Sequence, residues 1–142
     1  PMAEFFFREL VRRRGWEERF LVQSAAVSAE ETGNPVHPGT RRILEGMGID
    51  CSQKRARQMT REDYRRFDLI IGMDEDNLRR MRRICGGDAE GKFHLLMEYA
   101  SRPGDVADPW YTGDFEATRR DIAEGCQGLL ASLAGQAEGF PL

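Results

Sequence analysis

The most constraining feature of this sequence is the apolar run Phe67–Met73, which leads directly into the acidic residues Asp74-Glu75-Asp76. Such an apolar run is typical of a buried parallel strand. The acidic residues after it are of the type that caps helices, so we expect a helix to follow the strand. Such a strand is covered by helices on both faces of its sheet. We therefore expect a layered α/β domain built around Phe67–Met73.

Other segments of the chain supply the rest of that pattern. We expect strands at Phe20–Ser24 and Lys92–Leu96, because both are short, apolar and bounded by turn residues. We expect helices to open at Pro1 and at Asp114, each with an acidic residue near the positive end of the helix. Helices alternate with strands along the chain, which indicates a parallel sheet whose ligands bind at the carboxyl ends of its strands.

Composition narrows the class of protein. A chain of 142 residues with 40% apolar and 32% charged side chains is the size and balance of one globular domain, so we take residues 1–142 as a single domain. A net charge of −3 provides no broad basic field for nucleic acid, and no apolar run is long enough to span a membrane. The three cysteines form no C-x-x-C pair, which predicts free thiols and a cytoplasmic location.

The stretch Asp108-Pro109-Trp110-Tyr111 carries the clearest chemical signal. The proline favours an extended conformation at Asp108, and the neighbouring aromatic side chains partly desolvate a carboxyl group and raise its pKa. That suits Asp108 to acid catalysis, with Trp110 and Tyr111 stacking on a flat aromatic substrate. The alternative is an Asp-Pro turn whose two aromatic residues pack on the surface.

Asp74-Glu75-Asp76 has two interpretations. Acidic side chains at the end of a strand can hold a hard cation such as Mg²⁺. They also stabilise a helix N-terminus, and we favour that structural role. His37 and His94 have no ligand partner at metal-binding spacing, so we expect no metal site.

The segment Cys51-Ser-Gln-Lys-Arg-Ala-Arg57 matches the pattern C-x5-R of a phosphate-binding loop. A working loop of this kind turns consecutive backbone N–H groups inward, follows a buried strand and runs into a helix N-terminus. This segment has no glycine, and two further cations, Lys54 and Arg55, lie inside it. We therefore expect a connecting loop, with Cys51 not catalytic.

The whole chain resembles the low-molecular-weight protein tyrosine phosphatase family. The resemblance lies in six short stretches that follow the order and spacing of the family: Pro1-Met2-Ala3-Glu4, Val22-Gln23-Ser24-Ala25-Ala26, Gly33-Asn34-Pro35, Ala56-Arg57-Gln58, Phe67 to Asp74, and Asp108-Pro109-Trp110-Tyr111.

The resemblance implies a three-layer α/β/α fold with a four-stranded parallel sheet, like that of phosphotyrosine protein phosphatase I. It implies hydrolysis of phosphotyrosine in protein substrates, release of inorganic phosphate, and no cofactor or metal. Asp108 would be the general acid and base, and Trp110 and Tyr111 would bind substrate. Ser24 and Asp74 would support the phosphate loop. Many relatives have a histidine near Lys54, so that part of the support differs here.

The phosphate loop of this family has the form C-x5-R-[ST]-P and lies just before the first helix, where its proline corresponds to Pro1. The nucleophilic cysteine, the arginine that binds phosphate and the strand before them precede that position. We therefore expect a further N-terminal segment in the natural protein, with its strand between Phe20–Ser24 and Phe67–Met73.

Three other functions are compatible with the resemblance. A protein arginine phosphatase shares the architecture, but Trp110 and Tyr111 favour phosphotyrosine. An arsenate reductase of this fold needs additional cysteines after the Phe67–Met73 strand, where this chain has Asp74-Glu75-Asp76-Asn77. A non-catalytic phosphatase-like domain is the third alternative, because the family's nucleophile is not among these residues.

Overall fold

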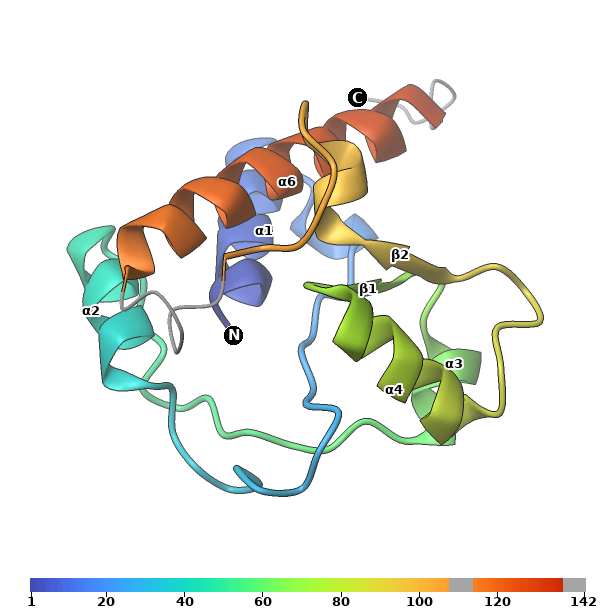
Figure 1. The fold of residues 1–142 in the computed structure, drawn as a ribbon. Coiled ribbons are helices and arrows are strands. Elements are labelled where there is room, and N and C mark those ends of the chain that lie inside the picture. The colour runs from blue at the N-terminus through green and yellow to red at the C-terminus, as the bar shows by residue number, and fades with distance from the viewer. Residues whose placement is uncertain (108–113, 137–142) are drawn as a thin grey trace.

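Helices surround a short parallel sheet in the computed structural model, which describes residues 1–107 and 114–136 (Figure 1). The long C-terminal helix lies across the N-terminal helix, and the sheet lies beside both of them. In chain order the elements are α1 (Met2–Arg13), the 3-10 helix η1 (Glu17–Arg19), α2 (Pro38–Gly46), α3 (Arg61–Arg66), β1 (Ile70–Gly72), α4 (Glu75–Cys85), β2 (Phe93–Leu95), the 3-10 helix η2 (Leu96–Tyr99) and α6 (Phe115–Gln136).

The sheet separates two layers of helices. Strands β1 and β2 are parallel, with Ile70 opposite Phe93 and Gly72 opposite Leu95. Successive side chains of a strand point to opposite faces, so Ile70 packs with Phe93 and Leu95 against the α4 side. Ile71 packs on the other face, against the core formed by α1 and α6. The expected α/β class with a parallel sheet and helices on both sides is therefore confirmed.

The number of strands differs from the expectation. The sheet of the described residues has two strands, not four, and the segment Phe20–Ser24 does not form one of them. Its backbone is extended at Phe20, but an extended segment becomes a strand only when a neighbouring backbone pairs with it. Side chains bond to its carbonyl groups here: Arg8 donates to Val22 O at 2.6 Å and Lys54 donates to Ser24 O at 3.3 Å.

The two ends of the described chain share one core. Phe6, Phe7 and Val11 of α1 are buried in the same apolar cluster as Ile122 and Leu130 of α6. The Sγ atom of Cys126 lies 3.7 Å from Ala3 O, so the helices touch closely.

On another side, α6 packs tightly on η2. A Cβ atom added to Gly128 would lie 1.7 Å from Tyr99 O, so only glycine fits there.

Polar caps begin several helices as the sequence predicts. Asp74 caps α4 by accepting a hydrogen bond from Asn77 N, and Asp114 caps α6 by accepting bonds from Glu116 N and Ala117 N. Asp63 accepts a hydrogen bond from Thr60 N at the start of α3.

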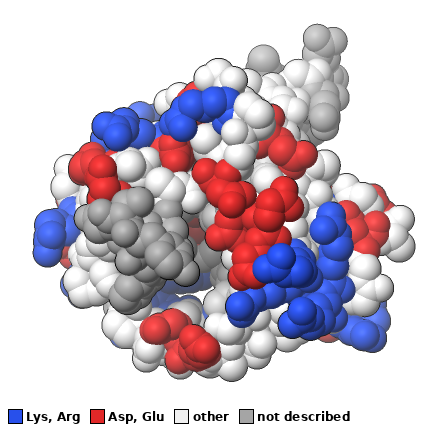
Figure 2. Space-filling model, in the orientation of Figure 1, with Lys and Arg blue, Asp and Glu red and all other residues white. Residues whose placement is uncertain are grey.

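Charges are segregated along α4. Figure 2 shows Lys and Arg side chains gathered over α4, beside acidic side chains at its N-terminal end. Glu75 and Asp76 occupy the first turn of this helix, and Arg82 and Arg83 occupy the last. Both groups of charges complement the helix dipole.

None of the helices within the described ranges is long and apolar enough to cross a lipid bilayer.

Candidate active site

The segment that leads to Asp108 is anchored at the carboxyl end of β1. Val106 N donates a hydrogen bond to Met73 O at 2.8 Å, and Glu75 N donates one to Asp105 Oδ1 at 3.1 Å. These two contacts are on either side of Asp74 in the chain. They place residues 105–107 beside the N-terminus of α4, at the edge of the sheet where α/β proteins bind their ligands.

The last residue before Asp108 is held by α6. Ala107 N donates to Asp121 Oδ2 at 3.0 Å, and Thr118 Oγ1 donates to Ala107 O at 2.7 Å. Asp121 also forms an ion pair with Arg102 through its other carboxylate oxygen. Both polar groups of Ala107 are therefore bonded to buried side chains of one helix, Thr118 and Asp121, each 6% exposed.

The proposed acid Asp108 and the proposed substrate-binding residues Trp110 and Tyr111 lie outside the described residues. The residues that border this segment are described, and both of them contact α6. Ala107 bonds to Thr118 and Asp121, while Asp114 caps the helix.

Asp74 has a structural partner in its own helix. Its Oδ1 accepts a hydrogen bond from Asn77 N at 2.7 Å, and Asn77 Oδ1 in turn accepts one from Met73 N at 3.0 Å. This pair fixes the turn between β1 and α4, as the helix-capping interpretation of Asp74 requires. Nowhere in residues 1–107 or 114–136 do three His, Cys, Asp or Glu side chains form a group that could hold a metal ion.

Ser24 belongs to a buried polar cluster that we call the Glu4 cluster, formed by Glu4, Arg8, Ser24 and Lys54. Ser24 Oγ donates to Glu4 Oε1 at 2.6 Å, and Lys54 Nζ lies 2.9 Å from the same oxygen. Arg8 Nη2 lies 2.6 Å from Glu4 Oε2. The Glu4 side chain is only 1% exposed, so it binds two cations and a hydroxyl group almost out of contact with water.

The central residue of this cluster was not among the predicted site residues. Glu4 was interpreted only as a favourable charge near the positive end of α1. A signal was present in the sequence, because Glu4 shares a helix face with the apolar residues Phe7 and Val11, three and seven positions later. Lys54 contacts Ser24 directly, by donating to its carbonyl oxygen, and indirectly, because both side chains bind Glu4.

The segment from Cys51 to Arg57 is a connecting loop. The Arg57 guanidinium group binds Asp63, with Nη1 and Nη2 each 3.0 Å from a carboxylate oxygen, and does not turn toward Cys51. Burial would raise the pKa of Asp63, but hydrogen bonds from Arg57 and from Thr60 N outweigh it and hold that pKa below its usual range. Arg57 therefore already has a structural counter-ion.

All three cysteines are free, as expected, and none of them has the environment of a nucleophile. Burial raises the pKa of Cys51 and of Cys85, and it raises the pKa of Cys126 to about 12. A nucleophilic cysteine needs the opposite shift, because the thiolate is the reactive form. None of Cys51, Cys85 and Cys126 therefore has the lowered thiol pKa that favours a nucleophilic thiolate.

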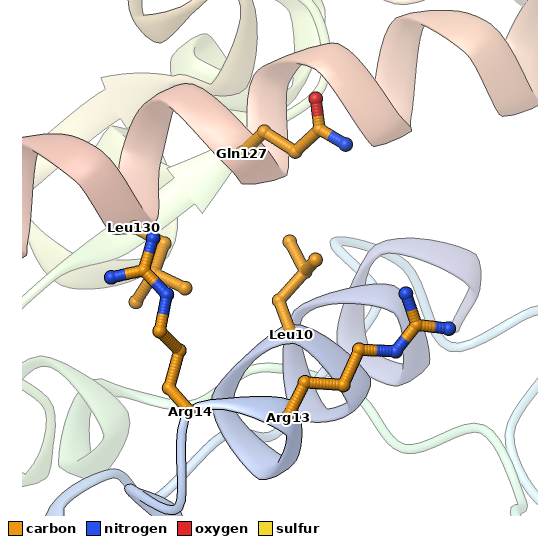
Figure 3. A pocket seen from close by; sticks show the side chains of 5 residues that line it. All are labelled: Leu10, Arg13, Arg14, Gln127 and Leu130. Atoms are coloured by element: carbon orange, nitrogen blue, oxygen red, sulfur yellow. The ribbon is translucent and has the colours of Figure 1, made fainter.

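A shallow cavity of about 220 Å³ lies elsewhere, between the C-terminal half of α1 and the middle of α6 (Figure 3). Its lining residues are Leu10, Arg13, Arg14, Gln127 and Leu130. They provide no carboxylate, thiol or imidazole group, so this cavity is not the candidate active site.

Comparisons with known proteins agree on one family. A model of the family described as low molecular weight phosphotyrosine protein phosphatase matches residues 1–138. The low molecular weight protein-tyrosine-phosphatase YfkJ of Bacillus subtilis is 39% identical over 94% of this chain and 86% of its own length. The human low molecular weight phosphotyrosine protein phosphatase is 36% identical over 92% of this chain and 85% of its own.

Solved structures give the same result. The crystal structure of YfkJ from Bacillus subtilis superimposes with a TM-score of 0.92 at 37% identity, covering 96% of this chain and 87% of that one. The low molecular weight protein tyrosine phosphatase of Streptococcus pyogenes superimposes with a TM-score of 0.83 at 38% identity, over 94% of this chain and 83% of that one.

Proposed function

This chain belongs to the low molecular weight phosphotyrosine protein phosphatase family, and on that premise we propose that it hydrolyses phosphotyrosine in protein substrates. The proposed reaction passes through a phosphocysteine intermediate. Asp108 acts in it first as general acid and then as general base. The observation that best supports this role of Asp108 is the anchoring of residues 105–107 at the carboxyl end of β1. These contacts bring the chain, just before Asp108, to the edge of the sheet where α/β proteins bind ligands.

In the first step a cysteine thiolate attacks phosphorus, and the bond between phosphorus and the tyrosine oxygen breaks. Asp108 gives its proton to that oxygen, so that neutral phenol leaves and Asp108 becomes a carboxylate. A phenol has a pKa near 10, so protonation removes much of the barrier to its departure.

In the second step a water molecule attacks the phosphocysteine and Asp108 takes up its proton. The sulfur–phosphorus bond breaks, inorganic phosphate forms and the thiolate is restored. The proton that Asp108 lost in the first step is regained, so no further acid or base is required. Every bond and proton is accounted for without a metal or a cofactor.

The proposal places the nucleophile in the family's C-x5-R-[ST]-P loop, ahead of α1, with Pro1 matching the proline of that motif. The high pKa values of Cys51, Cys85 and Cys126 support this, because each of these thiols is protonated at neutral pH. The arginine of the same motif would bind the phosphoryl oxygens.

The remaining proposed roles concern the walls of the site. Trp110 and Tyr111 would stack on the phenol ring of the substrate, which favours phosphotyrosine over phosphoarginine. Ser24 would hold the phosphate loop in shape, and its position in the Glu4 cluster gives it a fixed orientation. Asp74 would steady the loops around the site through its cap on α4.

The test is presteady-state kinetics of the natural enzyme and its Asp108→Asn variant on two substrates. Phenyl phosphate, which has a poor leaving group, should lose about 10²–10⁴-fold in the rate of phosphoenzyme formation. An aryl phosphate with an activated leaving group should lose far less, because its oxygen departs without a proton.

Asp114→Asn is the matched control for this substitution. Asparagine caps helices as well as aspartate does, so this variant should keep both rates. An equal loss on both substrates for Asp108→Asn, or no loss, would show that Asp108 is a turn residue and not the acid.

A further inference from the structure

We propose that Thr118 and Asp121 are positioning residues for Asp108: by holding the peptide groups of Ala107, these two side chains of α6 fix where the general acid stands relative to the substrate. This inference rests on the proposed function, because it assigns the acid role to Asp108. It adds a specific device on α6, the Ala107 clamp, which we define as Thr118, Asp121 and Arg102.

The clamp binds Ala107 on both sides. Asp121 Oδ2 accepts from Ala107 N at 3.0 Å, and Thr118 Oγ1 donates to Ala107 O at 2.7 Å. Thr118 and Asp121 are three residues apart, so they lie on the same face of α6 one turn from each other. An acceptor and a donor at this spacing match the N–H and C=O groups of a single residue, and the bonds leave Ala107 little freedom to rotate.

Arg102 fixes the orientation of the Asp121 carboxylate. Its guanidinium group pairs with Oδ1 of Asp121, which leaves Oδ2 directed at Ala107 N. Arg102 is itself 60% exposed, so the ion pair is partly screened by water and contributes little stability. Its geometric effect remains, because the carboxylate cannot turn without breaking one of the two contacts.

Thr118 also reaches the residue at the far border of the Asp108 segment. Its hydroxyl group lies 3.4 Å from Asp114 O, and Thr118 N lies 3.5 Å from the same oxygen. Ala107 and Asp114, the described residues on either side of positions 108–113, therefore both contact the Thr118 side chain.

This placement matters because general acid catalysis is sensitive to distance. The proton donor must come within hydrogen-bonding reach of the leaving oxygen, and a displacement of about 1 Å can lower the rate by about 10²-fold. Asp108 is bonded directly to Ala107, and Pro109 favours an extended conformation at Asp108. A shift of the Ala107 peptide is therefore passed on to the acid.

The experiment compares Thr118→Val with Thr118→Ser in the natural enzyme. Valine has almost the same shape as threonine but cannot donate to Ala107 O, whereas serine keeps the hydroxyl group. The readout is the ratio of turnover on phenyl phosphate to turnover on an activated aryl phosphate. Thr118→Val should lower this ratio about tenfold, a part of the full contribution of a general acid, and Thr118→Ser should restore it to within about threefold of the natural value.

Two further variants sharpen the comparison. Asp121→Asn keeps an oxygen for Ala107 N but loses the ion pair with Arg102, so it should lower the ratio by a few-fold. Glu116→Gln is the matched control, because Glu116 lies on the same helix and its exposed side chain pairs with Arg119, which is not part of the clamp. It should leave the ratio unchanged.

A double variant separates failure of the clamp from failure of the proposed function. If Thr118 acts through Asp108, then adding Thr118→Val to Asp108→Asn lowers the ratio no further. The clamp is refuted if Asp108→Asn lowers the ratio but Thr118→Val and Asp121→Asn behave like Glu116→Gln. If Asp108→Asn itself leaves the ratio unchanged, the assignment of Asp108 as the acid is wrong, and the role of the clamp fails with it.

Discussion

Replacing Glu4 by glutamine should lower the free energy of unfolding more than removing most other single charges from this protein. The Glu4 carboxylate binds Lys54 at 2.9 Å and Arg8 at 2.6 Å, and it accepts a hydrogen bond from Ser24. Glutamine has the same shape, so it leaves no cavity and the effect is that of the charge. Lys54 is only 17% exposed, and without Glu4 its ammonium group would be largely buried without this counter-ion.

The magnitude follows from the burial of each partner. Breaking a buried ion pair by removing one charge costs about 3–5 kcal/mol. Arg8 is 47% exposed, so water screens its share, which is below about 1 kcal/mol. The glutamine oxygen still accepts a hydrogen bond, which brings the expected loss to the lower end of the range, about 3 kcal/mol. In a domain of this size that lowers the melting temperature by about 6–12 °C.

The assay is urea unfolding at neutral pH, with Glu9→Gln as the matched control. Glu9 lies on the same helix and pairs with Arg12 and Arg13, but its side chain is 20% exposed and its partners are more than 60% exposed. Water screens these exposed pairs, so its loss should lower stability much less than Glu4→Gln does. Adding Lys54→Met to Glu4→Gln removes the unpaired cation and should restore at least about 1 kcal/mol. A loss below about 1 kcal/mol for Glu4→Gln, or no recovery in the double variant, would refute this account of the Glu4 cluster.

Two more predictions concern the cysteines. Cys51→Ser should keep the initial rate on phenyl phosphate within a few-fold, because the Arg57 guanidinium group is bound to Asp63 and not available to a phosphate group at Cys51. Loss of the phosphoenzyme in this variant would contradict the expectation. The fold raises the pKa of Cys126 from its usual 9.0 to about 12, because burial disfavours the thiolate. The folded state therefore gains from the neutral thiol fully below pH 9, and loses that stabilisation, about 4 kcal/mol in total, as the pH rises from 9 to 12. The free energy of unfolding of a Cys126→Ala variant should therefore fall less steeply with pH in this range, and parallel curves for the two proteins would contradict the prediction.

Local patterns predicted much of the fold. The apolar run at Phe67–Met73 contains β1, and the acidic residues after it open α4 as expected. The caps at Asp74 and Asp114 were visible because capping residues bond to backbone groups two or three positions away. Signals of this kind lie within a few residues of each other, so one sequence is enough to find them.

Contacts between distant segments could not be predicted in the same way. Thr118 and Asp121 bond to the backbone of Ala107, and a backbone partner leaves no mark on residue type. The segment Phe20–Ser24 has the composition of a strand, but pairing depends on a neighbour that the local pattern does not specify. Glu4 lies on an apolar helix face, which marks it as unusual without identifying Lys54 as its partner.

The packing of α1 against α6 determines when this protein can fold during its synthesis. The ribosome makes α1 first, yet Phe6, Phe7 and Val11 are buried partly by residues of α6, about a hundred positions later. At about 5–20 residues per second, the nascent chain exposes the apolar face of α1 for on the order of ten seconds before α6 is made. The residues made before α6 leave this apolar face partly uncovered, so the core shared by α1 and α6 can close only after α6 has left the ribosome.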